Sequence, residues 1–593
     1  MRFLPTSVKE LKELGWEQPD IILFTGDAYV DHPAFGAAVI GRVLEREGFK
    51  VAIVPQPNWR DDLRDFKKFG EPRLFFAVTA GNMDSMVNHY TAAKRLRSDD
   101  AYTPDGKAGF RPDYATVVYS KILKGLYANT PIVIGGVEAS LRRLTHYDYW
   151  SDSLKPSILI ESKADLLVYG MGERAIIEIA KKLNDGMPLE SLRAIPQVVY
   201  LEKNIEKYRR SKNAAILNSY EECKADKLKF AQNFKVIEEE SNRINSKILV
   251  EPIGNECVVV NPPFEPATSD EIDSWYDLPY TRLPHPRYKG KTIPAWEMIK
   301  FSVNIHRGCF GGCSFCTISA HQGRFISSRS EKSILKEIEE IKKLPGFAGY
   351  VSDLGGPSAN MYGMVPKDLS ICAKCKRPSC IYPNICKNLN SSHERINNLY
   401  SQVRKVKGIK KAFVGSGIRY DLFITRKENK PEREYFENLF LYHVSGRLKV
   451  APEHTSDDVL RLMRKPTFEL FKQLKQWFGA LNEKYGQKQQ LIPYFISSHP
   501  GSTEQDMKQL AEETRKLNYK LEQVQDFTPT PMTLASTIYF TGINPYTGEK
   551  VYVARSIEEK RKQQSHFFWY KNESKTPFTQ NKKRPSKRKP PIR

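Results

Sequence analysis

The first third of the chain alternates short apolar runs with amphipathic ones. The runs IILF, VAIV, LFFAVTA and PIVIGG are separated by stretches such as AFGAAVIGRVLEREG, in which apolar positions recur every three or four residues. This alternation predicts parallel strands connected by helices that cover both faces of a sheet. We therefore expect a Rossmann-like α/β domain over residues 1–205, with any ligand at the carboxyl ends of its strands.

A second alternating pattern occupies residues 293–553. Six strand-like runs, each followed by helix-like sequence, occur in the order IKFSVNI, AGYVSDL, KKAFVGS, RLKVAP, QLIPYFIS and LEQVQDFTP. After the first run, Ile334 and Ile338 share one helical face, with Ser330 as the expected N-cap. Six βα units predict a partial (β/α)6 barrel, whose chemistry should lie where its strands end.

The remaining segments differ from both patterns. Residues 206–292 combine a charged, helix-prone run with a stretch rich in proline and aromatic residues, which predicts a helical connector followed by an extended arm. Residues 554–593 are highly charged, and from Lys571 onward they hold nine basic residues against one acidic residue. We expect a charged C-terminal extension that is disordered from about residue 571.

Three cysteines follow the first strand of the second pattern. The stretch FSVNIHRGCFGGCSFCTISAHQGR places Cys309, Cys313 and Cys316 at the spacing C-x3-C-x2-C among glycines. Thiols gathered in a glycine-rich loop predict a metal site, because such a loop turns tightly and directs N–H groups at sulfur. A structural zinc requires four ligands, whereas an iron–sulfur cluster held by three thiolates leaves one iron open.

This loop, with Phe315 directly before its last cysteine, resembles the cluster motif of radical S-adenosylmethionine (SAM) enzymes. The whole chain resembles the YgiQ-like family of these proteins. The resemblance implies that Cys309, Cys313 and Cys316 hold a [4Fe-4S] cluster and that SAM binds the open iron. It also implies that one electron, from an external donor of the flavodoxin or ferredoxin type, cleaves SAM to methionine and a 5′-deoxyadenosyl radical.

The resemblance extends to SAM contacts at the ends of the barrel strands. Five residues are implied by their place after the second, third and fourth strands: Gly355, Gly356, Ser416, Arg419 and Glu453. The glycine pair departs from the usual pattern, because Pro357 stands where an acidic residue is normally found. The sequence identifies no residue that acts directly on a substrate.

Four more cysteines lie in an insertion, residues 358–390, that follows the glycine pair. They are Cys372, Cys375, Cys380 and Cys386. Four cysteines within fifteen residues, with no long apolar helix to bury them, predict a second metal site. Tetrahedral zinc that staples the insertion is the simpler interpretation, and an auxiliary iron–sulfur cluster is the alternative.

The N-terminal domain resembles the cobalamin-binding domain that precedes many radical SAM barrels. In that domain a histidine is expected in the pattern D-x-H-x-x-G, whereas here His32 directly follows Asp31 and stands four residues before Gly36. We therefore do not expect cobalamin to bind. A nicotinamide or flavin is also not expected, because no G-x-G-x-x-G turn opens a helix in this domain.

The charge of the chain suggests an anionic partner. Lys and Arg number 92 against 69 Asp and Glu, which gives a net charge of +23. Part of this excess lies in the C-terminal tail, and Lys94, Arg95 and Arg97 form a modest patch that we expect on a helix. RNA is therefore a candidate substrate or partner, attracted by salt-sensitive contacts to phosphate.

The chain has no apolar run long enough to span a bilayer, and its start lacks the apolar core of a signal peptide. Seven of the nine cysteines are bunched between Cys309 and Cys386, which favours metal ligation in a reducing compartment. We therefore expect a cytoplasmic protein without a membrane partner. The competing hypothesis to a radical SAM enzyme is a non-catalytic zinc and nucleic-acid-binding protein.

Overall fold

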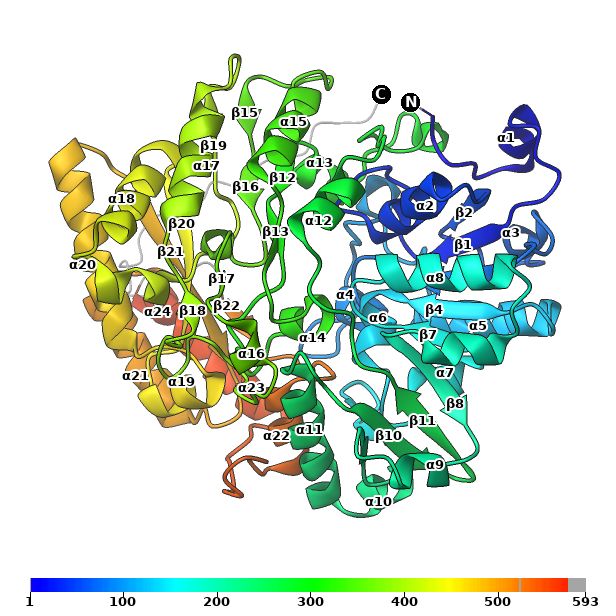
Figure 1. The fold of residues 1–593 in the computed structure, drawn as a ribbon. Coiled ribbons are helices and arrows are strands. Elements are labelled where there is room, and N and C mark those ends of the chain that lie inside the picture. Colours follow the sequence, from blue (N-terminus) through cyan, green and yellow to red (C-terminus); the bar gives the residue numbers. More distant parts are fainter. Residues whose placement is uncertain (1, 522–523, 574–593) are drawn as a thin grey trace, which may run out of the picture.

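A computed structural model describes residues 2–521 and 524–573. A nine-stranded sheet, coloured from blue through cyan to the dark green of β10 and β11, forms one half of the protein in the order β2-β1-β3-β4-β7-β8-β11-β10-β9 (Figure 1). Five neighbouring strands run parallel: β2 (Val51–Pro55), β1 (Ile21–Thr25), β3 (Phe75–Thr79), β4 (Ile132–Gly135) and β7 (Leu166–Val168). The other four extend the sheet, mostly antiparallel: β8 (Val198–Glu202), β11 (Glu256–Val260), β10 (Ile248–Ile253) and β9 (Ala214–Ile216).

Helices bury both faces of the parallel strands. Leu23 and Val133 pack on one face with α2 (Gly36–Arg46) and α8 (Glu173–Asn184). Their neighbours along the strands pack on the other face with α5 (Ala115–Leu126). Because successive strand residues point to opposite faces, burial on both sides requires the continuous apolar runs that the sequence shows.

The sheet continues past residue 205, where the sequence predicted a helical connector. The segment does hold helices, among them α10 (Tyr220–Ala225) and α11 (Lys227–Ser241), but β9, β10 and β11 also belong to it. Strands β10 and β11 form a hairpin whose turn contains Gly254 with a φ of +54°. Glu251 and Pro252 interrupt the apolar run of β10, so the hydrophobic pattern alone did not predict this strand.

The barrel forms the green to orange half of the protein (Figure 1). All six predicted runs form strands, and the second run gives two, β15 (Tyr350–Val351) and β16 (Asp353–Gly355). The strands pair in parallel: β12 (Ser302–Asn304) with β16, β15 with β19 (Lys411–Ala412), and β20 (Arg447–Glu453) with β21 (Gln490–Ser497), which pairs with β22 (Val524–Asp526). The prediction of a partial (β/α)6 barrel behind a Rossmann-like domain is confirmed. Ser330 caps α15 (Glu331–Ile341), as expected, because its side chain accepts a hydrogen bond from the Ser333 N–H.

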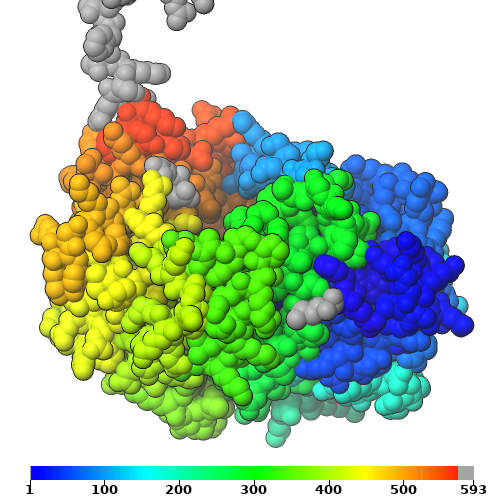
Figure 2. Space-filling model, turned by 90° about the horizontal axis from the view of Figure 1, so that it is seen from above, coloured from blue at the N-terminus to red at the C-terminus, as the bar shows by residue number. Residues whose placement is uncertain are grey.

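The C-terminal segment packs against the barrel, contrary to the prediction of a charged extension from residue 554. Helix α23 (Ile557–Ser565) is followed by Phe567, which is fully buried in the barrel core, and by α24 (Trp569–Glu573). Most of the predicted disorder, from about residue 571, lies outside the described residues. Figure 2 shows the green middle of the chain between the blue N-terminal part and the yellow and orange part.

Strand β10 carries a carboxyl group that no cation in the described part of the chain neutralises. Glu251 is 1% exposed, and its Oε2 accepts a hydrogen bond of 2.8 Å from the Thr145 N–H. Its Oε1 has no hydrogen-bond partner among the described residues. Burial raises the pKa of Glu251 from 4.5 to about 7.

We expect this group to make stability pH-dependent. Between pH 4.5 and 7 the folded protein holds a proton that the unfolded chain releases, so the free energy of unfolding falls as pH rises, by about 3 kcal/mol in total. The variant Glu251→Gln should lose this dependence and exceed the natural protein in stability at pH 8. Denaturant unfolding of both proteins at pH 5 and pH 8 measures it, and equal slopes would contradict it.

Candidate metal centre and adjoining cavity

The first three cysteines lie in a loop that leaves the barrel and returns to it. Strand β13 (His306–Arg307) enters the loop, and α14 (Ile318–Gln322) leads back to β14 (Ser327–Ser328), which pairs antiparallel with β13. The Cys309 N–H donates to the Gly323 carbonyl oxygen at 3.1 Å and closes the loop. Gly308 has a φ of +86°, and a Cβ there would overlap the Phe325 carbonyl, so this turn requires glycine.

The three thiols of this three-cysteine loop, residues 308–323, are half-buried beside a cation. A Cβ on Gly311 would lie 3.3 Å from Cys309 Sγ and 3.9 Å from Cys313 Sγ, so glycine leaves space next to both sulfurs. Burial, with a contribution from neighbouring thiolates, raises the pKa of Cys309 to about 11 and that of Cys316 to about 12. These thiols therefore keep their protons until a metal displaces them.

Arg419 provides the cation beside the loop. Its Nη1 lies 3.2 Å from Cys313 Sγ, while its Nε and Nη2 donate to Asp421 at 2.9 and 2.6 Å. Glu453, at the end of β20, faces Lys465, with 3.6 Å between Oε1 and Nζ. Burial raises the pKa of Glu453. The predicted residues Arg419 and Glu453 therefore lie near the loop, each paired with a charged side chain that the sequence did not single out.

The predicted glycine pair lies at the end of β16. A Cβ on Gly355 would overlap Ser416 Oγ, and the Ser416 hydroxyl donates to Asp353 Oδ2. Gly355 and Ser416 therefore come together as predicted, held by Asp353. A Cβ on Gly356 would lie 2.5 Å from the ring of His306, whose two nitrogens have no partner in the described part of the chain. Burial lowers the pKa of His306 to about 3, so this ring is neutral.

The loop is also held from the C-terminal end of the chain. His499 Nε2 lies 3.3 Å from Ser314 Oγ inside the three-cysteine loop. On α23, Gln563 Oε1 accepts hydrogen bonds from the Ser498 N–H at 2.9 Å and from Ser502 Oγ at 3.2 Å. Gln563 Nε2 donates to the Ser502 carbonyl at 2.7 Å. Helix α23 thus fixes the segment that contacts Ser314 of the three-cysteine loop.

The four predicted cysteines of the insertion lie directly beside the three-cysteine loop. The Cys380 N–H donates to the Phe310 carbonyl at 3.1 Å, and Gly312, with a φ of +63°, leaves no room for a Cβ against the Pro378 carbonyl. All nine cysteines are free thiols. Within residues 2–521 and 524–573, no three or more His, Cys, Asp or Glu side chains are placed to hold one metal ion.

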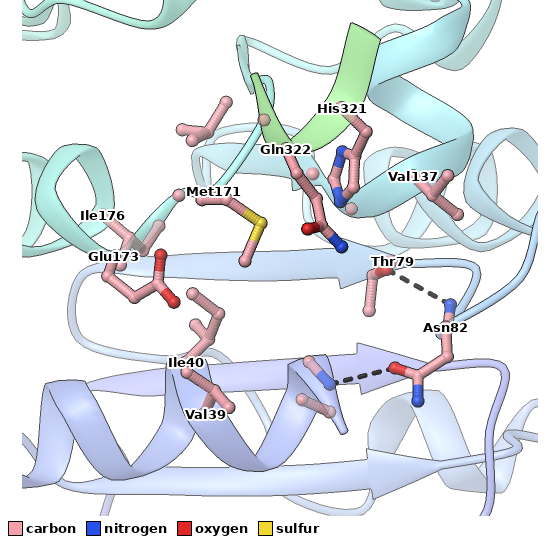
Figure 3. Close-up of a pocket in the computed structure, with 18 of the residues that line it drawn as sticks. Val39, Ile40, Thr79, Asn82, Val137, Met171, Glu173, Ile176, His321 and Gln322 are labelled. Atoms are coloured by element: carbon pink, nitrogen blue, oxygen red, sulfur yellow. Dashed lines mark hydrogen bonds between the residues drawn. The ribbon is translucent and has the colours of Figure 1, made fainter. Parts of the chain in front are cut away.

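A cavity of about 540 Å³ separates the three-cysteine loop from the sheet (Figure 3). It lies where β1, β3, β4 and β7 end, as expected for a ligand site of a parallel sheet. Apolar side chains of α2 and α8, such as Val39, Ile40 and Ile176, line one side, and His321 and Gln322 of α14 line the other (Figure 3). Its volume suits a small organic ligand.

His32 does not line this cavity. Its Nδ1 accepts a hydrogen bond from the Ala34 N–H at 3.1 Å, and its Nε2 lies 2.9 Å from Arg282 Nη2. Both ring nitrogens are therefore engaged within the protein. Asp31, its neighbour, pairs with Arg42 at 2.6 Å. Asp31 and His32 thus hold α2 and the arm in place, through Arg42 and Arg282 respectively.

The basic patch of Lys94, Arg95 and Arg97 is exposed but does not lie on a helix, contrary to the prediction. Helix α4 (Ser85–His89) ends before it, because His89 Nδ1 and Tyr90 OH each bind Asp113 at 2.7 Å. The patch instead forms a turn closed by a bridge between Tyr90 and Leu96. No helix in the described part of the chain is long and apolar enough to cross a membrane.

Three family models match successive parts of the chain. Residues 3–302 match the model described as Radical SAM N-terminal, residues 303–514 match the Radical SAM superfamily, and residues 522–588 match a domain of unknown function. The UPF0313 protein of Porphyromonas gingivalis is 60% identical over 96% of this chain and 91% of its own length. The UPF0313 protein of Bacteroides thetaiotaomicron is 58% identical over 97% and 95%.

Among solved structures, the radical S-adenosylmethionine methyltransferase TsrM from Kitasatospora setae, with cobalamin and a [4Fe-4S] cluster bound, is 16% identical with a TM-score of 0.47. The match covers 87% of this chain and 77% of that chain.

Proposed function

This chain belongs to the UPF0313 family of radical SAM enzymes, and we propose that it binds a [4Fe-4S] cluster through Cys309, Cys313 and Cys316 and cleaves SAM reductively. This is the YgiQ-like family that the sequence predicted. The observation that carries the proposal is one loop that holds three free thiols in a glycine cradle at the open ends of the barrel strands. Three thiolates leave one iron for SAM, and the cluster supplies the electron that cleaves it.

The residues around the loop fit this group. Gly311 leaves space next to two of the sulfurs that a Cβ would fill. Gly308 and Gly312 lie at turns of the loop, where a Cβ would overlap a neighbouring carbonyl. Cysteine side chains reach their ligand positions by rotation about χ1, so the path of the loop backbone is what the fold must provide. The raised pKa values of Cys309 and Cys316 mean that cluster binding releases protons.

We assign the SAM contacts to the five residues predicted at the strand ends: Gly355, Gly356, Ser416, Arg419 and Glu453. The glycine pair lets Ser416 and the His306 ring pack directly against the end of β16. Arg419 offers a buried cation for the SAM carboxylate while Asp421 orients it. Glu453 and Lys465 supply an acceptor and a donor on the opposite strand end.

The decisive experiment is SAM cleavage by the anoxically purified, iron-reconstituted protein. With dithionite or a reduced flavodoxin as donor, we expect 5′-deoxyadenosine and methionine to form in equal amounts, at a rate that depends on the protein. Chromatography with mass detection measures both products. No 5′-deoxyadenosine above the protein-free control would refute the proposal, and a colourless zinc protein would favour the non-catalytic alternative.

We propose RNA as the substrate class on the strength of charge. The net charge of +23 and the exposed turn of Lys94, Arg95 and Arg97 attract phosphates, and the basic tail lies beyond the described residues. Filter binding of total RNA by the same preparation near physiological ionic strength tests this part. If no affinity is found, RNA is excluded and a small molecule or protein becomes the substrate.

A further inference from the structure

The insertion folds its four cysteines into two turns. Cys372 ends the short helix α16 (Leu369–Cys372), and the Cys375 N–H donates back to the Cys372 carbonyl at 3.2 Å. A second turn joins Cys380 and Cys386 through a hydrogen bond of 2.7 Å between the Cys386 N–H and the Cys380 carbonyl. Cys380 and Cys386 also border one hydrophobic cluster with Ile381 and Leu389, and the Leu389 N–H donates to the Cys386 carbonyl at 2.9 Å.

Arg324 is buried against these thiols. It is 3% exposed, and its Nη2 lies 3.4 Å from Cys380 Sγ and 3.8 Å from Cys375 Sγ. Its Nη1 donates to the Arg377 carbonyl, and its Nε has no partner among the described residues. Asn388 Nδ2 approaches a third sulfur, Cys372 Sγ, at 3.5 Å. Two side-chain donors thus point at three of the four sulfurs.

The burial of Arg324 requires a negative charge nearby. A buried guanidinium costs several kcal/mol unless an anion compensates it. No Asp or Glu in the described part of the chain forms an ion pair with Arg324, so the sulfurs of Cys375 and Cys380 are the available anions. Thiols become permanently anionic when they bind a metal, and donors to their sulfurs are typical of such sites.

This site shares a wall with the three-cysteine loop. Arg324 directly follows Gly323, whose carbonyl closes that loop on Cys309. Phe310 packs in one hydrophobic cluster with Ile381 and Leu389 of the insertion, and Cys309, Cys380 and Cys386 border the same cluster. Cysteines of both groups therefore border one shared hydrophobic cluster.

We propose that Cys372, Cys375, Cys380 and Cys386 hold a second iron–sulfur cluster that passes electrons to the cluster of the three-cysteine loop. This rests on the proposed function of that loop. A zinc ion would hold the insertion together equally well. Zinc does not change its oxidation state, however, so neither the contact with the three-cysteine loop nor the charge of Arg324 would serve electron transfer. Hydrogen bonds to sulfur and nearby charge set the potential of an iron–sulfur cluster, which gives Arg324 a role.

The electron balance is simple. A reduced donor protein of the ferredoxin or flavodoxin type loses one electron, and the second cluster gains it. The second cluster then returns to its oxidised state as the cluster of the three-cysteine loop is reduced by one electron. No bond forms or breaks in this relay and no proton is transferred, so the step needs no reactant besides the donor.

Iron content tests the second cluster independently of SAM chemistry. The anoxically reconstituted protein should contain about eight irons per chain, and about four should remain in the variant with Cys309, Cys313 and Cys316 replaced by Ala. The variant with all four insertion cysteines replaced by Ser should also retain about four. After dithionite reduction, electron paramagnetic resonance should show a different iron–sulfur signal in each variant.

Two outcomes overturn the proposal. The first is one zinc and no iron–sulfur signal in the Cys309, Cys313 and Cys316 variant, which would make the insertion a structural zinc site. The second is a variant with no bound metal at all. Both are distinct from failure of the proposed function, because that function is judged by 5′-deoxyadenosine from the intact protein, whereas this measurement uses metal and signal in a protein unable to form it.

The role of Arg324 is tested in the same background. Arg324→Gln removes a positive charge that faces two sulfurs, so we expect the midpoint potential of the second cluster to become more negative. Lys374→Gln is the matched control, because Lys374 lies between two of the cysteines but is exposed to solvent. A redox titration monitored by electron paramagnetic resonance should show a larger shift of the midpoint potential for Arg324→Gln than for Lys374→Gln. Equal shifts would remove Arg324 from the proposal.

Discussion

Single replacement of Cys309, Cys313 or Cys316 by Ala is expected to lower 5′-deoxyadenosine formation by more than about 100-fold. Residues that merely support a metal ligand cost 10- to 100-fold when changed, and a lost ligand costs more. The loop backbone is held by Gly323 and by the His499 contact, neither of which involves the thiols, so the fold should persist. Product formation and circular dichroism of each variant measure both parts.

The matched control for these variants is Cys257→Ala. Cys257 is fully buried in β11 of the sheet, far along the chain from the loop, and the substitution is the same. It should leave product formation unchanged within the error of the assay. If any of the three loop variants retained activity comparable to Cys257→Ala, the loop would not be the site that accepts the electron.

The largest expected loss of stability comes from Glu337 on α15. Its two carboxylate oxygens bind two buried guanidinium groups, Arg282 at 2.5 Å and Arg329. Arg282 belongs to the arm, so this triad joins the arm to the barrel. Glu337→Ala leaves both cations without a carboxylate, and breaking a buried ion pair in this way costs about 3–5 kcal/mol.

Glu339→Ala on the same helix is the control. The Glu339 side chain is 52% exposed and pairs with Lys342 at 2.7 Å, so its removal should cost less than about 1 kcal/mol. Denaturant unfolding of the two variants, followed by tryptophan fluorescence, gives the difference. Equal stabilities would mean that water or a neighbouring group already compensates Arg282 and Arg329.

The pattern of apolar residues predicted those strands whose own residues carry a clear apolar pattern. The runs that became β1 to β4 are covered on both faces, so their apolar residues are continuous and visible in the sequence. In the barrel strands β20 and β21, buried residues alternate with less buried ones, a pattern that the sequence also shows. Strands β9 to β11 escaped because they extend an existing sheet. Glu251 and Pro252 interrupt the apolar pattern of β10. Strand β11 pairs with β8, which joins residues about sixty positions apart in the sequence.

The metal-binding thiols were visible in the sequence because their spacing is local, but their surroundings were not. His306, Lys465 and Arg324 have no motif of their own. They gain meaning only when the fold sets them beside Gly356, Glu453 and Cys380. Gln563 was hidden for the same reason, since it lies in a segment whose charge predicted an extension from the fold.

The hydrogen bonds of Gln563 can form only late in the synthesis of the chain. The segment that holds His499 against the three-cysteine loop is anchored by a residue roughly 250 positions after Cys316. At about 5–20 residues per second, a ribosome needs on the order of 10 to 50 seconds to make that stretch. During this interval Gln563 cannot yet anchor the segment of His499, so the three-cysteine loop gains its C-terminal contacts only near the end of synthesis.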